Sequence, residues 1–209
     1  FFFFKQKTAY EIPKRDWSSD VCSSDLKQSL GAQFSLGGSL VAIGTISSDS
    51  GDGVDDKLVF ISSQGQIAVY QGTDPTSATL WSLAGVYYMG TPVSQRCVFD
   101  VGGDLGIISS GGIISTQEAM QKSRAATERS AITNKIQTLF NSYVRDYGSN
   151  EGWMPLVYPK GNYLLINIPV STTQYNQLIM NTTTGAWSRF TGMNGKCFGL
   201  LSDNLYFGA

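Results

Sequence analysis

Apolar residues in the first half of the chain come in short runs, and clusters of Gly, Ser, Asp and Pro separate these runs. Runs of this length that end in turn-forming residues predict β-strands. The predicted strands span residues 39–46, 57–62, 66–71, 81–88, 96–101 and 105–108. Residues 63–65 predict a hairpin turn, after which Ile67 and Val69 share one face of the strand and Ala68 and Tyr70 share the other.

The pattern becomes helical near Ser115. Ser115 and Glu118 have the spacing of a capping box, which predicts a short helix up to about Gln121. A longer helix is predicted next, because apolar residues recur at the spacing of one buried stripe, and Gly148 is expected to end it. The stripe contains Ile132, Ile136, Leu139, Phe140, Tyr143 and Val144. A second set of predicted strands follows at residues 163–168, 177–181, 186–190, 197–201 and 205–207.

The two strand-rich segments resemble each other. Residues 57–61 and 67–70 of the first match residues 162–166 and 177–180 of the second. The next run begins at Trp81 in one segment and at Trp187 in the other, and a fourth run begins at Arg96-Cys97 and at Lys196-Cys197. Units of four strands that repeat every 40–50 residues or so are typical of β-propeller blades. Two unrelated antiparallel meanders are the alternative explanation.

We therefore predict a mainly β fold with a helical insertion, arranged as a partial β-propeller-like array of about two four-stranded blades. The first 26 residues are expected to lie outside it, because two of their segments resemble the fixed blocks of a translated sequencing adapter. A natural Ser-rich acidic leader is the alternative. The expected regions are a non-native leader at residues 1–26, a first blade region at 27–113, the helical insertion at 114–148 and a truncated second blade region at 149–209. Because a propeller ring closes with about four to eight blades, we expect the chain to be a fragment.

Composition excludes several classes of chemistry. The chain contains no histidine, which removes imidazole bases, Ser-His-Asp and Cys-His nucleophiles and His-ligated metals. Its 15 basic and 16 acidic residues give a net charge of −1, which argues against a broad basic surface for duplex DNA. No apolar run approaches the roughly 18 residues of a membrane helix. We therefore expect no cofactor, no sequence-specific nucleic acid partner and no membrane partner.

Residues 47–54 resemble the Asp-box turn of sialidase-type propellers, although Val54 stands where the tryptophan belongs. Asp49, Asp52, Asp55 and Asp56 offer oxygens to a calcium ion, but their spacing departs from the EF-hand pattern. We expect a solvated acidic loop between two strands here, and no metal.

An enzyme is not expected. A glycosidase needs two carboxylates at a fixed distance, whereas two of the three glutamates beyond the leader, Glu118 and Glu128, lie in the helical segment. Most aspartates sit in turn sequences, where Asp is favoured for its local backbone hydrogen bonds. Cys97 and Cys197 are at equivalent places in the two repeats and are expected to be small buried strand residues.

Basic residues gather in the helical insertion between Gln121 and Tyr147. They are Lys122, Arg124, Arg129, Lys135 and Arg145. Such a group is typical either of a solvated helix face or of a surface that meets phosphates or an acidic partner. We take these five residues as the candidate subunit interface.

Four sequence motifs resemble those of a known protein family. They are residues 69–75, Arg96-Cys97 with residues 102–105, residues 180–187 and residues 204–208. They resemble a family of phage structural proteins that is similar to the tail accessory, or packaged-DNA stabilisation, proteins of short-tailed phages, which form a tail hub. The resemblance covers residues 57–209 and brings no catalytic residues with it.

The resemblance implies an assembly function, in the tail or at the junction of head and tail, with retention of packaged DNA. The implied partners are other virion subunits, in a homo-oligomeric ring and with portal or tail proteins. The implied location is the virion, after assembly in the bacterial cytoplasm. The alternative is a carbohydrate-binding or sialidase-like propeller, for which Trp81 and Trp187 would be exposed binding residues.

Overall fold

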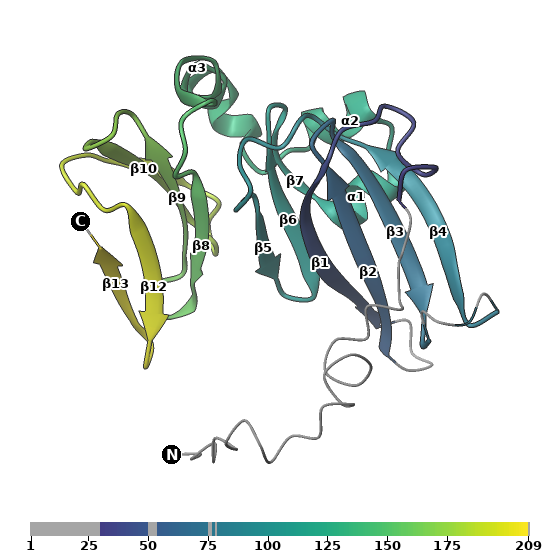
Figure 1. Cartoon of the computed structure of the whole chain (residues 1–209). Helices are drawn as coiled ribbons and strands as arrows, with labels where there is room; N and C mark the ends of the chain where they lie inside the picture. Colours follow the sequence, from purple (N-terminus) through teal and green to yellow (C-terminus); the bar gives the residue numbers. More distant parts are fainter. Residues whose placement is uncertain (1–29, 50–53, 75–76, 78, 209) are drawn as a thin grey trace, which may run out of the picture.

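The computed structural model describes residues 30–49, 54–74, 77 and 79–208, which form four antiparallel sheets with few helices (Figure 1). The mainly β fold is therefore confirmed.

The first sheet is the meander of β1 (Leu40–Asp49), β2 (Val54–Ser62), β3 (Gln66–Gly72) and β4 (Trp81–Tyr88). The second sheet contains β5 (Val98–Val101), β6 (Asp104–Ser109) and β7 (Gly112–Ser115). The third sheet is the meander of β8 (Met154–Tyr158), β9 (Tyr163–Pro169), β10 (Tyr175–Asn181) and β11 (Trp187–Phe190). The fourth, which we call the C-terminal hairpin, pairs β12 (Cys197–Leu201) with β13 (Asn204–Gly208).

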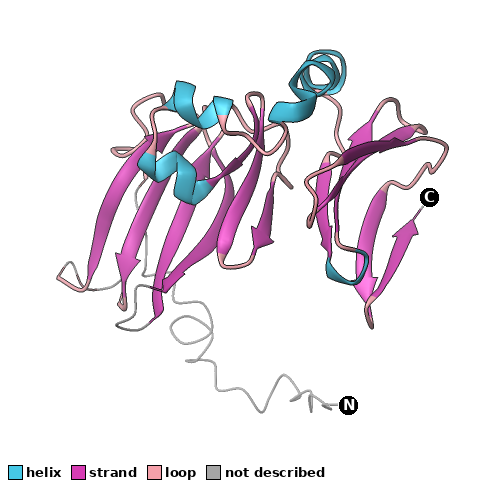
Figure 2. Ribbon diagram, turned by 180° about the vertical axis from the view of Figure 1, so that it is seen from behind, coloured by secondary structure: helices cyan, strands magenta, loops and turns pink. Residues whose placement is uncertain are grey.

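The helices lie between the second and third sheets in the sequence. They are α1 (Thr116–Gln121), α2 (Arg124–Arg129), the 3-10 turn η1 (Asn134–Ile136) and α3 (Gln137–Tyr147). A further 3-10 turn, η2 (Pro159–Gly161), joins β8 to β9. Figure 2 shows the two short helices beside the strands of the first two sheets, and the longest helix above the boundary between the second and third sheets. The insertion is therefore packed into the fold.

One hydrophobic core joins the first three sheets and α3. Its members include Val59 of the first sheet, Ile107 of the second, Ile166 of the third and Phe140 of α3, all of them fully buried. The ring of Phe140 meets the edge of the fully buried Trp153 with ring centroids 6.3 Å apart. Burial of this much aliphatic and aromatic surface is the main force that holds the three sheets together.

The alternation predicted for the strand after the hairpin turn is confirmed. Ile67 and Val69 face the main core, whereas Ala68 and Tyr70 face the other side of the first sheet. There they form a second cluster with Phe60 and with Phe34, which precedes β1. A third cluster lies between the third sheet and the C-terminal hairpin and contains Leu165, Ile179 and Phe198.

The sequence repeat is clearest in two hairpins. In the β5–β6 hairpin Val98 pairs with Ile107, and in the C-terminal hairpin Phe198 pairs with Phe207. Every pairing of β5 with β6 recurs 100 residues later between β12 and β13. Both turns place two central residues at positive φ, Gly102 and Gly103 in the first and Ser202 and Asp203 in the second. A two-residue turn of this kind fits the twist of a tight hairpin.

The predicted grouping of strands was wrong in one respect. The runs that begin near Arg96 and Lys196 do not complete the sheets before them, because each begins a separate sheet. The fourth strands of the two meanders are instead β1 and β8, and neither β8 nor β7 was predicted. Both missed strands are short: β7 begins with Gly112, directly after Gly111, and β8 contains Pro155.

The predicted long helix is interrupted. Its stripe residue Ile132 is outside the helices, since its backbone N–H donates to the carbonyl of Ile113 in β7 at 2.9 Å. The hydroxyl of Thr133 accepts a hydrogen bond from the N–H of Ile113 at 3.2 Å. This pairing extends the edge of the second sheet and prevents a continuous helix. Phe140 and Tyr143 are buried in α3 as predicted, and Gly148 is its C-cap.

Candidate functional site

The start of α1 is fixed to the second sheet. The N–H of Glu118 donates to Oγ of Ser115 at 3.3 Å, which confirms the predicted N-cap. The carboxylate of Asp104 in β6 accepts the N–H of Gln117 at 3.2 Å and the hydroxyl of Ser115. Thr116 donates its hydroxyl to the carbonyl of Leu105 at 2.8 Å. Asp104 is therefore a helix-anchoring residue, a role that its turn sequence did not predict.

The carboxylate of Glu118 connects α1 to the end of α2. It accepts hydrogen bonds from Nζ of Lys122 at 3.0 Å and from Oγ of Ser130 at 2.8 Å. Partial burial acts to raise the pKa of Glu118, but the hydrogen bonds from Ser130 and Lys122 outweigh it, so that the pKa lies below its ordinary value. Glu118 is therefore ionised at neutral pH and holds the two short helices together.

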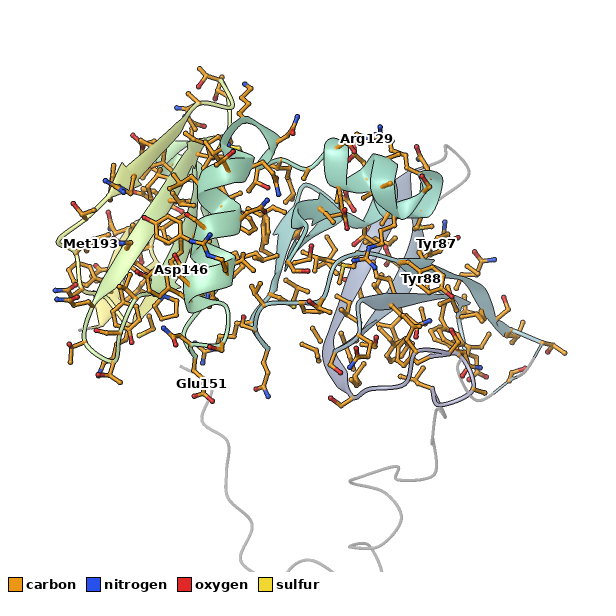
Figure 3. All side chains as sticks on the ribbon, turned by 90° about the horizontal axis from the view of Figure 1, so that it is seen from above. Tyr87, Tyr88, Arg129, Asp146, Glu151 and Met193 are labelled. Atoms are coloured by element: carbon orange, nitrogen blue, oxygen red, sulfur yellow. The ribbon has the colours of Figure 1, made fainter. Side chains whose placement is uncertain are left out.

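The five candidate interface residues are all exposed, but they do not form one cluster. Figure 3 shows Arg129 on α2 far from Asp146 on α3, which is the ion-pair partner of Arg145. Nζ of Lys135 lies 3.4 Å from the carbonyl oxygen of Gly185, in the turn between β10 and β11. The insertion thus presents several separate cations.

Three of these cations are paired within the chain. Lys122 pairs with Glu118 at 3.0 Å and Arg124 with Glu128 at 3.0 Å, each one helical turn apart. Arg145 contacts the neighbouring Asp146 at 2.8 Å. Exposed pairs of this type contribute little to stability, but they reduce the positive field that a phosphate would meet.

Two of the candidates do share a surface hollow. Arg124 and Arg129 line a hollow of about 580 Å³ beside α2, together with Glu128. The remaining polar lining comes from Asn134, Gln137, Asn141 and Ser110. Its mixture of two guanidinium groups, one carboxylate and several amides suits hydrogen bonding to another protein surface better than binding of a bare anion.

A second hollow, of about 410 Å³, lies where three strands begin. Its lining comes from the segments that precede β5, β8 and β12, and includes Arg96, Glu151 and Lys196. The hydroxyl of Ser94 donates to the carbonyl of Trp153 at 3.1 Å, which ties the first two segments together. The sequence matched Arg96 with Lys196 but did not predict that they line one hollow.

A buried amide pair fixes the path into the C-terminal hairpin. Nε2 of Gln177 donates to Oδ1 of Asn167 at 2.9 Å and to the carbonyl of Met193 at 2.9 Å. Nδ2 of Asn167 donates to the carbonyl of Gly195 at 3.2 Å. Both amide side chains are fully buried on adjacent strands of the third sheet. They serve the packing of the hairpin connection.

The two cysteines of the repeats differ in environment. Cys97 is fully buried as predicted, and burial raises its pKa to about 11, which leaves an unreactive thiol. Cys197 is exposed, so the expectation of a second buried strand residue was wrong. The difference arises because the hairpin that follows Cys97 lies between two sheets, whereas the C-terminal hairpin packs on the third sheet only.

The acidic loop is shorter than predicted. Asp49 ends β1, and Asp55 and Asp56 are in β2, so these three aspartates belong to paired strands. Oδ1 of Asp56 accepts the hydroxyl of Ser47 at 2.6 Å across this pair. Asp52 lies outside the described residues. Within the ranges that the structure describes, no three Cys, Asp or Glu side chains gather as a metal site requires.

The two tryptophans at matched sequence positions pack against different clusters. Trp81 stacks on Tyr70 with ring centroids 5.6 Å apart, next to the second cluster. Trp187 packs against the main core. Both rings are partly buried, whereas the carbohydrate-binding alternative requires exposed tryptophans. Trp81 pairs with Gly72 and Trp187 with Met180, and each ring lies on the side of its sheet that faces away from the hairpin that follows, so the two positions are equivalent.

Large apolar side chains are exposed on two surfaces that sequence reasoning missed. The first is the side of the first sheet opposite the main core, which we call the outer face. It includes Leu40, Ile43, Leu83 and Tyr88, all of them exposed. The second is the side of the C-terminal hairpin directed away from the third sheet, which we call the open face and which presents Leu201 and Tyr206. Surfaces of this kind are commonly interaction sites.

No protein-family model matches the chain, and the search of curated proteins found no match either. Among the described residues no helix has the length and apolar character needed to cross a membrane.

Proposed function

We propose that this chain belongs to a phage virion structural protein that acts in tail or head-to-tail assembly and in retention of packaged DNA. The sequence resemblance over residues 57–209 supplies the virion context. One structural observation supports an assembly role. The chain repeats a unit that consists of a four-stranded sheet followed by a hairpin, and the strand pairing of the hairpin is the same in both repeats. A protein that is built from such units offers broad sheet faces to neighbouring subunits.

We also propose that the sheets follow a propeller-like arrangement. Strands β5, β8 and β12 each come first in their sheets, and β8 contacts both of the others. All three begin at the hollow lined by Arg96, Glu151 and Lys196. Strands that begin together and lie side by side run in the same direction, as the innermost strands of neighbouring blades do around a channel.

The exposed faces of α1 and α2 are the candidate docking surface for another virion subunit. Lys122, Arg124 and Arg129 are on this side, and the hollow beside α2 offers both donors and acceptors. An acidic or amide-rich surface of a portal, tail or identical subunit would complement them. The carbohydrate-binding alternative has no such support, because both Trp81 and Trp187 are packed against clusters.

The virion itself provides the test. Particles of a phage that encodes this chain would be purified and analysed by quantitative mass spectrometry, with and without a deletion in the gene. We expect peptides of the chain at a fixed ratio to the portal protein, and deletion mutants that fill heads but lose their DNA. Absence of the chain from intact virions, together with unchanged DNA retention in the mutant, would overturn the proposal.

A further inference from the structure

The stacking of sheets within the chain follows a rule. The β5–β6 hairpin packs on the first sheet through the side that carries Leu105, since a Cβ on Gly44 of β1 would lie 2.5 Å from Cδ2 of Leu105. The C-terminal hairpin packs on the third sheet through the side that carries Leu205, the matching residue 100 positions later. In both units, then, the same hairpin side covers the preceding sheet.

The other side of the first hairpin is also covered. Figure 1 places the second sheet between the first and the third, and β5 contacts β8. Cys97, Phe99 and Ile108, which alternate away from Leu105, are buried in the main core. The open face of the C-terminal hairpin is its counterpart, but here Leu201 is 67% exposed and Tyr206 is 54% exposed. Cys197 is exposed for the same reason.

The outer face of the first sheet is the complementary surface. It corresponds to the side of the third sheet on which the second sheet and α3 pack. Phe34 covers part of the outer face from a segment that precedes β1, much as Phe140 covers the third sheet from α3, which precedes β8. The part near β1 stays open, where Ile43 is 52% exposed and Leu40 is 45% exposed. The strand of the third sheet that corresponds to β1 is β8, and β5 of the second sheet packs against β8.

We propose that the open face of the C-terminal hairpin docks on the outer face of the first sheet in a second copy of this chain. Leu201 and Tyr206 of one copy then contact Leu40 and Ile43 of the next. The contact continues the interface already present between the second and third sheets. Because the two surfaces differ, the association is head-to-tail, and it produces a ring if the rotation closes or an open array if it does not.

Complementary variants test this geometry. Tyr206→Asp disables the open face and Ile43→Asp disables the outer face, and each replaces an exposed side chain, so that the fold is retained. In light scattering after size-exclusion chromatography, the unmodified chain is expected to increase in mass with concentration beyond two copies. Each variant alone is expected at the mass of one chain. An equimolar mixture is expected to form a complex of two chains and no larger species, because one productive pair of faces survives.

Phe190→Asp is the matched control, since Phe190 is 47% exposed on β11 and belongs to neither face. It is expected to associate as the unmodified chain does. Circular dichroism checks the fold of every variant, and Leu201→Asp and Leu40→Asp replace any variant that does not fold. Equal association of all variants, or a single-chain mass for the unmodified protein at every concentration, overturns the proposal and assigns the faces to a different occupant.

Thiol labelling gives an independent readout in a Cys22→Ser background, which removes the third cysteine of the chain, in its first 26 residues. Cys197 is expected to react with iodoacetamide at least tenfold more slowly in the associated protein than in Tyr206→Asp, whereas Cys97 is unreactive in both. Unchanged labelling of Cys197 contradicts the proposed contact. This inference rests on the proposed assembly function for its biological role, but the tests are separate: purified chains report the contact, and virion composition reports the function.

Discussion

The matching turns of the two repeats adopt the same left-handed backbone conformation with different residues. The turn between β5 and β6 uses Gly102 and Gly103 at φ of 59° and 89°. The matching turn between β12 and β13 uses Ser202 and Asp203 at φ of 48° and 58°. Left-handed backbone costs a residue with a Cβ about 1 kcal/mol, whereas glycine adopts it freely. The second turn is therefore the more strained one.

Exchange of these residues is expected to change stability in opposite directions. Ser202→Gly removes a left-handed strain of about 1–2 kcal/mol but gives the unfolded chain more conformational freedom, which costs about 0.4–1 kcal/mol, so the free energy of unfolding should rise by about 1 kcal/mol or less. Gly102→Ser should lower it by about 1 kcal/mol, and this cost is purely conformational, because a Cβ at Gly102 has no atom within 4 Å. Urea titration at neutral pH measures both changes.

Ser202→Ala is the control for the lost hydroxyl, since it retains the Cβ and should stay within about 0.5 kcal/mol of the unmodified chain. A stabilisation by Ala as large as that by Gly would show that the side chain, and not the backbone, is the source of the strain.

At the level of elements, periodicity predicted the parts whose burial pattern is simple. Strands β3 and β4 were predicted well because each is a short, mainly apolar run with turn-forming residues on both sides. The start of α1 was predicted from Ser115 and Glu118, because a side-chain cap is a local interaction. Strand β7 was missed since its four residues are too few for a period, and the break before α3 depends on pairing of Ile132 with a strand 19 residues earlier.

The connection between α1 and α2 is expected to weaken in acid. The hydrogen bonds from Ser130 and Lys122 lower the pKa of Glu118 in the folded chain, so its ionised form stabilises the fold. This contribution is complete above the ordinary glutamate pKa of about 4.3 and is lost as the pH falls through the lowered value. Glu118→Gln should therefore reduce the urea midpoint at pH 7, and this effect should disappear as the pH falls through the lowered pKa of Glu118.

Ser130→Ala serves as the companion variant, because it removes the hydroxyl that donates to Glu118 at 2.8 Å. In that background the difference between Glu118 and Gln at pH 7 should shrink. If Glu118→Gln lowers the midpoint equally at pH 7 and throughout the acid range, the effect is one of packing and the electrostatic explanation fails.

For the whole molecule, the sequence predicted the repeat but not how its units stack. The match of Arg96-Cys97 with Lys196-Cys197 identified the two hairpins correctly, because turn residues and apolar positions coincide over both strands. Which side of a hairpin is covered depends on contacts with other sheets, and for the β5–β6 hairpin these involve residues more than 50 positions away. The difference between Cys97 and Cys197, like the hollow shared by Arg96 and Lys196, therefore could not be predicted from local pattern.

The two matched hairpins are expected to open at very different free energies in one chain. The β5–β6 hairpin belongs to the core that joins three sheets, whereas the C-terminal hairpin contributes Phe198, and partly Leu205, to a cluster with the third sheet alone. Hydrogen exchange measured by mass spectrometry on dilute chain should show amides of residues 197–208 exchanging first, and the matched amides of residues 98–108 near the rate of global unfolding. The pairing registers of the two hairpins are identical, but β6 also pairs with β7, so the difference in exchange reports both the burial of the hairpin sides and this additional strand pairing. Since Phe198→Ala removes the main contact with Leu165 and Ile179, it should accelerate exchange in the C-terminal hairpin at least tenfold and leave the first hairpin unchanged. Equal protection of the two hairpins in dilute solution would mean that the open face is already covered within a single chain.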